Sequence, residues 1–117
     1  MKWVVLFHED FDPEFNALPE DVQDELLAHA SMLRTFGPGL GRSWVDTLKG
    51  SHHPNMKGLR FKAGDGAWRV AFPHRRAILL ICGNKSGGSE KRFYRELIRK
   101  ADKRFDNHLA RIKNEKR

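Results

Sequence analysis

The sequence has 117 residues, of which 39% are hydrophobic and 32% charged, with a formal net charge of +7 and a single cysteine, Cys82. This length suits one domain, because two independent cores would each lack buried surface. No apolar run approaches the roughly 18 to 20 residues of a membrane span, one cysteine forms no internal disulfide, and the N-terminal apolar stretch is too short for a signal peptide. We therefore expect one cytoplasmic domain over residues 1–117, without contact to a membrane, in which Cys82 is a core thiol.

Basic charge is concentrated after the N-terminal region. Residues 1–25 carry one lysine and eight acidic residues, whereas residues 26–117 carry 21 lysines and arginines and seven acidic residues. Such asymmetry favours a polyanionic partner, either a nucleic acid or an acidic protein segment. The alternative is a solvated helix face with spare lysines.

The first part of the chain predicts a strand and two helices. Alternating apolar residues predict a strand over residues 3–7, apolar on both faces and therefore near the middle of a sheet. Pro13 and Pro19 suit the first turns of helices over about residues 12–18 and 19–36. The second helix carries a stripe at helical spacing that faces a core, formed by Val22, Leu26, Ala30 and Leu33.

A break and a hairpin follow. The sequence Gly-Pro-Gly at residues 37–39 ends the helix, and residues 40–55 lack a period and predict an ordered surface loop. Two alternating segments then predict a hairpin with a turn over residues 63–66. Their apolar faces match when two pairs are opposite each other, namely Phe61 with Trp68 and Leu59 with Val70. This register places Arg60 directly across from Arg69.

The last third predicts a strand and a long helix. The apolar run 77–82 is typical of a central strand, and a glycine-rich loop follows over residues 83–89. The helix begins at Ser89, frays into a basic tail from about residue 110, and has apolar residues at close to helical spacing: Phe93, Leu97, Ala101, Phe105, Leu109 and Ile112.

These elements predict an α+β fold. Their order is an N-terminal strand, two helices, a three-stranded antiparallel meander and a C-terminal helix, with the helices packed on one side of the sheet.

Two arginines that face each other across a hairpin need a counter-charge. Like charges directly opposite on a sheet cost about 0.2 to 1 kcal/mol, and a guanidinium presents a fork of donors matched to phosphate oxygens. Arg60 and Arg69 are therefore candidates for a phosphate-binding pair. The alternative is that they extend into water or pair with an acidic side chain from a neighbouring loop.

Other polar residues are candidates for the same site. Lys62 shares the arginine face, and Lys85 lies in a glycine-rich loop whose amides can approach a phosphate. Tyr94 could offer its hydroxyl group, while His53, with its neighbour His52, titrates near neutrality and suits proton transfer. These histidines, Cys82 and His74 do not reproduce a zinc spacing, so no metal site is expected.

The residues also resemble a known family. The segments LKGSHHPNMKGLRFKAGDGAWRVAF and AILLICGNKSGGSEKRFYRELIRKADKRFDNHL are similar to the HigB-like, phage Gp49-like branch of the RelE/ParE toxin superfamily, and the resemblance covers nearly the whole chain. The family pattern is matched by Lys49, Gly50, Ser51, His53, Asn55, Met56, Lys57, Leu59, Arg60, Arg69, Lys85, Tyr94, Ala101, Asp102, His108 and Leu109. Gly58 and Asn84 stand where the family pattern has acidic residues, which puts any role of those acids in doubt.

The resemblance implies the RelE-like fold and the toxin of a type II toxin-antitoxin system, held in a hetero-oligomer by a helix-turn-helix, HigA-like antitoxin. RelE-like and HigB-like relatives cleave mRNA, usually on the ribosome, whereas ParE-like relatives inhibit DNA gyrase. A degenerate toxin that only binds its antitoxin is a third alternative.

Our leading hypothesis is an mRNA endoribonuclease that needs no metal or cofactor. The catalytic candidates are Arg60, Arg69, Lys85, Tyr94 and His53. The candidates for binding the RNA backbone are Lys57, Lys62, Lys91, Arg92 and Arg95.

Overall fold

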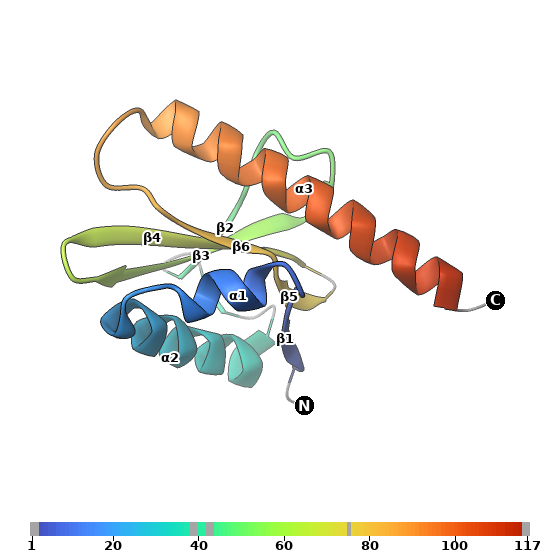
Figure 1. Cartoon of the computed structure of the whole chain (residues 1–117), viewed down its shortest axis with the longest axis horizontal. Coiled ribbons are helices and arrows are strands. Elements are labelled where there is room, and N and C mark those ends of the chain that lie inside the picture. Colours follow the sequence, from blue (N-terminus) through green and yellow to red (C-terminus); the bar gives the residue numbers. More distant parts are fainter. Residues whose placement is uncertain (1–2, 38–39, 42–43, 75, 116–117) are drawn as a thin grey trace.

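A computed structural model describes residues 3–37, 40–41, 44–74 and 76–115 (Figure 1). The elements in chain order are β1 (Val5–Phe7), α1 (Phe11–Asn16), α2 (Glu20–Phe36), β2 (Val45–Thr47), β3 (Met56–Ala63), β4 (Gly66–Pro73), β5 (Ala77–Leu79), β6 (Ile81–Asn84) and α3 (Glu90–Glu115). This content confirms the α+β class and both predicted N-terminal helices. The predicted break at Gly37 is present, with a positive φ of 56°, while Pro38 and Gly39 lie outside the described residues.

Over the described residues, the strands form two sheets. A four-stranded antiparallel sheet has the order β2-β3-β4-β6, and β1 pairs with β5 in parallel as a two-stranded sheet. The β3–β4 register is the predicted one, with Phe61 opposite Trp68 and Leu59 opposite Val70. The hairpin turn contains Gly64, whose φ of 56° suits a glycine.

Two predictions about where strands begin and end are wrong. The segment 40–55, expected to be a loop, contains β2, a three-residue edge strand with no sequence period of its own. The apolar run 77–82, expected to be one strand, is divided between β5 and β6. Near Leu80 the chain changes partners, because the Leu79 carbonyl oxygen accepts from the His8 N–H and the Leu80 N–H donates to the Ala71 carbonyl oxygen, both at 2.9 Å.

The first strand lies at an edge rather than near the middle of a sheet. Its one strand partner within the described residues is β5. Val4 and Leu6 are consequently 72% and 56% exposed. The apolar character of this side of the strand therefore does not mean that it is buried.

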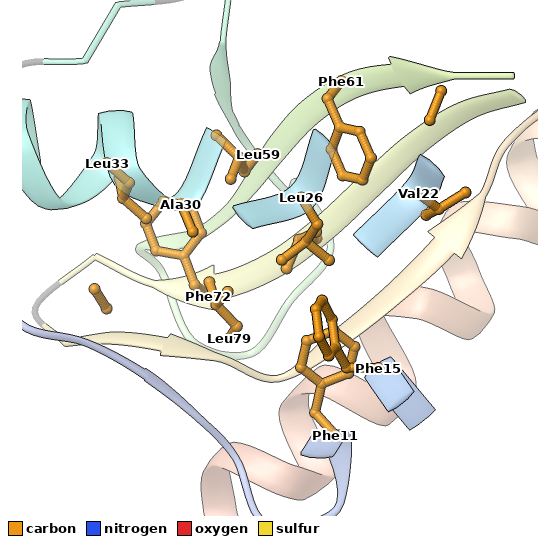
Figure 2. Close-up of a cluster of buried hydrophobic side chains, with 13 residues drawn as sticks. Phe11, Phe15, Val22, Leu26, Ala30, Leu33, Leu59, Phe61, Phe72 and Leu79 are labelled. Carbon is orange, nitrogen blue, oxygen red and sulfur yellow. The ribbon is translucent and has the colours of Figure 1, made fainter. Parts of the chain in front are cut away.

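One face of the four-stranded sheet packs against α1 and α2. Side chains of α1 and α2 point into the layer between these helices and the strands (Figure 2). The predicted stripe on α2 is confirmed, because all four of its residues are buried. The same core contains Phe11, Phe15, Leu59, Phe61, Val70, Phe72 and Leu79.

The opposite face packs against α3, so the prediction that all helices cover one side is wrong (Figure 1). Side chains alternate along a strand, and on this second face small and apolar residues such as Met56 and Ala71 lie among the arginines. Leu97 and Ala101 of α3 are buried against them. The sheet therefore has apolar surface on both faces, and each face requires a helix.

The helix α3 continues to Glu115, so residues 110–115, which were expected to begin a frayed tail, are helical in the structure. Arg111 forms an ion pair with Glu9, and Ile112 is half-buried, which holds this end of the helix against the N-terminal region. Within the described ranges, no helix combines the length and apolarity that a membrane crossing needs.

Close packing of α3 depends on Gly83. A Cβ atom built at Gly83 would lie 2.8 Å from Cε1 of Phe93, whereas a Cβ atom at Gly41 would meet nothing within 4 Å. We expect Gly83→Ala to lower the free energy of unfolding by about 1 to 3 kcal/mol, because overpacking forces the helix to shift. Gly41→Ala is the matched control and should leave the urea midpoint within experimental error. Equal midpoints for both variants would contradict the close contact.

A second contact links α1 to α3. The Arg104 guanidinium donates hydrogen bonds to both carboxylate oxygens of Glu14 and to the carbonyl oxygen of Leu80. The hydrogen bond from Arg104 lowers the pKa of Glu14 below its ordinary value of 4.5, against a smaller opposing effect of burial.

The lowered pKa of Glu14 gives a pH dependence with a definite sign. A carboxyl group with a lower pKa in the folded state adds stability above its unfolded pKa, and this stability disappears as the pH falls through the folded pKa. We expect Glu14→Gln to reduce the urea midpoint at pH 7, and the midpoints of the wild type and the variant to converge as the pH falls below 4.5 and through the lowered pKa of Glu14. A difference that stays constant with pH would contradict this ion pair.

Candidate functional site

Arg60 and Arg69 lie directly opposite each other on β3 and β4, as predicted. The Arg60 N–H donates to the Trp44 carbonyl oxygen at 2.8 Å. It therefore points away from β4 and makes Arg60–Arg69 a non-hydrogen-bonded pair, in which side chains lie closest. Both side chains project from the sheet face that α3 covers.

The two guanidinium groups have different partners. Arg60 forms an ion pair with Asp46 on β2, and its buried Nε has no hydrogen-bond partner among the described atoms. Arg69 donates from Nε to the Tyr94 hydroxyl oxygen at 3.0 Å and from Nη1 to the Trp68 carbonyl oxygen at 2.9 Å. Within the described part of the chain, Arg69 has no carboxylate partner, so its positive charge is not neutralised locally.

Asp46 is not identified from the sequence, but its ion pair confirms, for Arg60 alone, the alternative that an acidic side chain from the neighbouring segment pairs with the arginines. It becomes a neighbour of the arginines because β2 pairs with β3. This pairing places Asp46 opposite Gly58, two residues before Arg60 on β3. The Gly58 position, where the family pattern has an acid, packs under Leu48: a Cβ atom there would lie 3.0 Å from Leu48 Cδ2. Residues 40–55 lack a periodic pattern that would predict this pairing.

Two predicted lysines lie near the arginine pair. Lys62 is on the arginine face and lines a groove of about 470 Å³ that both arginines border. Lys85 donates from Nζ to Glu90 at 3.3 Å, and Glu90 lines a second groove of about 620 Å³ together with Tyr94. The fold thus gathers Arg60, Arg69, Lys62, Lys85 and Tyr94 in one region of the molecule.

Three exposed basic residues surround the start of α3. Lys91, Arg92 and Arg95 are all exposed. Their side chains form no ion pair with any residue in the described ranges, so they are available to an anionic partner.

Two other candidates lie elsewhere. Lys57 shares the sheet face of Leu59 and Phe61, opposite the arginine face, and donates to Thr47 at 2.8 Å. The ring of His53 packs on Phe105 of α3, with the ring centroids 4.7 Å apart. Phe105 is 11 residues beyond Tyr94, or about 16 Å along the helix at 1.5 Å per residue. His53 is therefore remote from the arginine pair.

His53 belongs instead to a second polar cluster. His52 and His53 both contact Asp106 of α3, and His52 also contacts the buried Asp102. Partial burial raises the pKa of Asp106, but hydrogen bonds from His53 and His52 outweigh this effect and leave the pKa below its ordinary value. Neither aspartate of this cluster is predicted as a site residue from the sequence, although Asp102 belongs to the matched family pattern.

The order of elements, the antiparallel sheet and the C-terminal helix are compatible with a RelE-like fold. Residues 13–106 match the family described as phage derived protein Gp49-like. The chain belongs to this family, and the resemblance stated from the sequence is confirmed.

Two relatives from Mycobacterium tuberculosis are similar to this chain. The protein named "Putative toxin HigB2" is 39% identical over 105 residues, which cover 86% of this chain and 52% of the relative, so the chain spans about half of that protein's length. The protein named "Putative toxin HigB3" is 41% identical over 99 residues, which cover 82% of this chain and 84% of the relative. No solved structure matches the chain significantly.

Cys82 is half-buried on β6 and belongs to the packing around the α2 core. Burial raises the pKa of the Cys82 thiol to about 12, with a further contribution from the charge of Glu14. Because the thiolate is the reactive form, we expect iodoacetamide at pH 8 to alkylate Cys82 far more slowly in the folded protein than in urea, as followed by mass spectrometry. Equal rates in both states would show an accessible, reactive thiol.

Proposed function

We propose that this chain is the toxin of a type II toxin-antitoxin system and an endoribonuclease that cleaves mRNA at the ribosome. Its family and its similarity to two proteins named as HigB toxins support the toxin class. The observation that carries the nuclease activity is the facing pair of Arg60 and Arg69, in which Arg69 has no carboxylate partner among the described residues.

A phosphodiester is a suitable ligand for this pair. Each guanidinium can donate two parallel hydrogen bonds to phosphate oxygens. The phosphate has to displace Asp46 from Arg60, and an ion pair as exposed as this one contributes only about 0 to 1 kcal/mol. The repulsion between the two arginines, which Asp46 relieves only at Arg60, falls when an anion lies between them.

The reaction that fits these residues is attack by the ribose 2′-oxygen on the adjacent phosphorus. The new bond forms a 2′,3′-cyclic phosphate, the bond to the 5′-oxygen breaks, and the 2′-hydroxyl proton leaves to solvent water. Arg60 and Arg69 bind the non-bridging oxygens, where negative charge develops in the transition state. Tyr94 accepts a hydrogen bond from Arg69, so its own proton is free to be donated to the leaving 5′-oxygen. Lys85 is paired with Glu90, and it would support the leaving group by exchanging this carboxylate for the substrate.

The RNA backbone follows the exposed cations around this region. Lys62 borders the arginines, and Lys91, Arg92 and Arg95 extend the positive charge over the first turns of α3. Phosphate contacts of this kind weaken steeply with salt. Lys57 is not part of this surface.

The proposed protein partner is a helix-turn-helix antitoxin, which would bind in place of RNA. An acidic or amphipathic segment of the antitoxin would complement the same basic face. The toxin and antitoxin would then form a hetero-oligomer in which the arginine pair is covered.

Alanine substitutions distinguish a specific role of the two arginines from the effect of losing any positive charge. We expect Arg60→Ala and Arg69→Ala each to reduce mRNA cleavage by about 10² to 10³-fold, the loss typical of removing one donor to a developing oxyanion. Lys57→Ala removes a cation from the opposite sheet face and should cleave at the wild-type rate. Cleavage is measured by primer extension on a transcript in a translating extract, with circular dichroism to confirm folding.

Two results would contradict the nuclease proposal. The first is a folded Arg60→Ala/Arg69→Ala double variant that cleaves at the wild-type rate. The second is growth arrest by the wild-type chain with intact transcripts and broken DNA, which would identify gyrase as the target.

A further inference from the structure

The loop between β2 and β3 brings two adjacent histidines against the middle of α3. The Nε2 atom of His53 lies 2.7 Å from Oδ1 of Asp106, and Nε2 of His52 lies 3.1 Å from Oδ2 of the same carboxylate. The ligand atoms of these three residues all lie within 4.8 Å of one another. Two imidazole nitrogens and a carboxylate thus converge on one point at the surface.

We propose that His52, His53 and Asp106 form a binding site for a divalent transition metal of the zinc class. Two imidazole nitrogens and one carboxylate oxygen are a common ligand set for Zn²⁺. They disfavour Mg²⁺ and Ca²⁺, which prefer oxygen ligands. The proposal replaces the expectation from sequence spacing, because that spacing offered only Cys82 and His74 as further ligands and did not reveal Asp106.

The ligand separations suit such an ion. With metal–ligand distances of about 2.0 to 2.2 Å, two ligands of a tetrahedral ion lie roughly 3.3 to 3.5 Å apart. The contacts of His52 Nε2 with the two oxygens of Asp106, at 3.1 and 3.3 Å, are already close to this value. The 2.7 Å contact of His53 would lengthen by about 0.6 to 0.8 Å as the ion replaces a shared proton. The side chains of His52 and Asp106 are 61% and 50% exposed, so the ion can enter and a water can complete its coordination.

A buried carboxylate, held by hydrogen bonds of its own, fixes the position of His52. Its Nδ1 atom lies 3.1 Å from Oδ2 of Asp102, whose side chain is only 9% exposed. Asp102 is itself fixed by hydrogen bonds from the Ser51 hydroxyl and from the His52 N–H. This carboxylate faces Nδ1, which leaves Nε2 turned toward the proposed ion. A carboxylate beside the ring nitrogen that does not bind the metal is the usual arrangement around histidine ligands.

The site would join two segments that are far apart in the sequence. A metal bound there links the β2–β3 loop to α3, across more than 50 residues, and should stabilise the folded chain by mass action. Asp106 is 12 residues beyond Tyr94, or about 18 Å along α3, so the site has no direct contact with the proposed nuclease site and does not depend on that proposal.

Metal binding is tested with the full chain, without a histidine tag and stripped with EDTA. We expect isothermal titration with ZnCl₂ to give one bound ion per chain, Co²⁺ to give visible absorption bands of a nitrogen-containing site, and Zn²⁺ but not Mg²⁺ to raise the unfolding temperature. His53→Gln and Asp106→Asn should each weaken Zn²⁺ binding at least tenfold. Asp65→Asn, which removes an exposed acid in the β3–β4 turn, is the control and should bind as the wild type does.

Two outcomes would overturn the proposal. One is a wild-type chain that binds no Zn²⁺ and shows no shift in unfolding temperature, which would leave the cluster as a network of hydrogen bonds. The other is wild-type affinity in both folded variants, which would place the ion on other histidines. Because neither readout uses RNA cleavage, failure here is distinguishable from failure of the nuclease proposal.

Discussion

The contact of α3 with the second face of the sheet determines where the candidate functional residues lie. Phe93 rests on Gly83, where any side chain would collide, and Leu97 and Ala101 fill the space above the strands. This close approach lets Tyr94 reach Arg69 at one end of the helix. Further along the same helix, it lets two aspartates reach the histidine loop. One packing interaction therefore organises two polar sites about three turns apart.

The two arginines are alike in sequence but not in their electrostatic surroundings. Arg60 already has a counter-ion, while Arg69 has only a phenol oxygen and a backbone carbonyl oxygen. A neutral partner orients a guanidinium without cancelling its charge, so Arg69 keeps the stronger attraction for an anion. Under the proposed function, a phosphate would bind Arg69 first and then take the place of Asp46 at Arg60.

The sequence predicts those features that depend on local periodicity and not those that depend on remote pairing. The hairpin register, and with it the arginine pair, follows from alternation over residues 56–73. The strand β2 is too short to show a period, and the apolar run 77–82 does not reveal that the chain changes sheets at Leu80. The helix on the second face is not predicted, because the arginines on that face suggest exposure to water, whereas the small and apolar residues beside them pack against α3. Asp46 and Asp106 enter their sites only through tertiary contacts.

The central claim is that Arg60 and Arg69 together bind an RNA phosphate. Its most direct test is a nuclear magnetic resonance titration that follows the arginine Nε–Hε signals while a 2′-O-methyl oligoribonucleotide, which cannot be cleaved, is added. The account predicts that the Arg60 and Arg69 signals shift together and saturate at one equivalent, with Arg104 unmoved at its ion pair with Glu14. Shifts confined to the exposed arginines of α3, with these two signals unchanged, would contradict it.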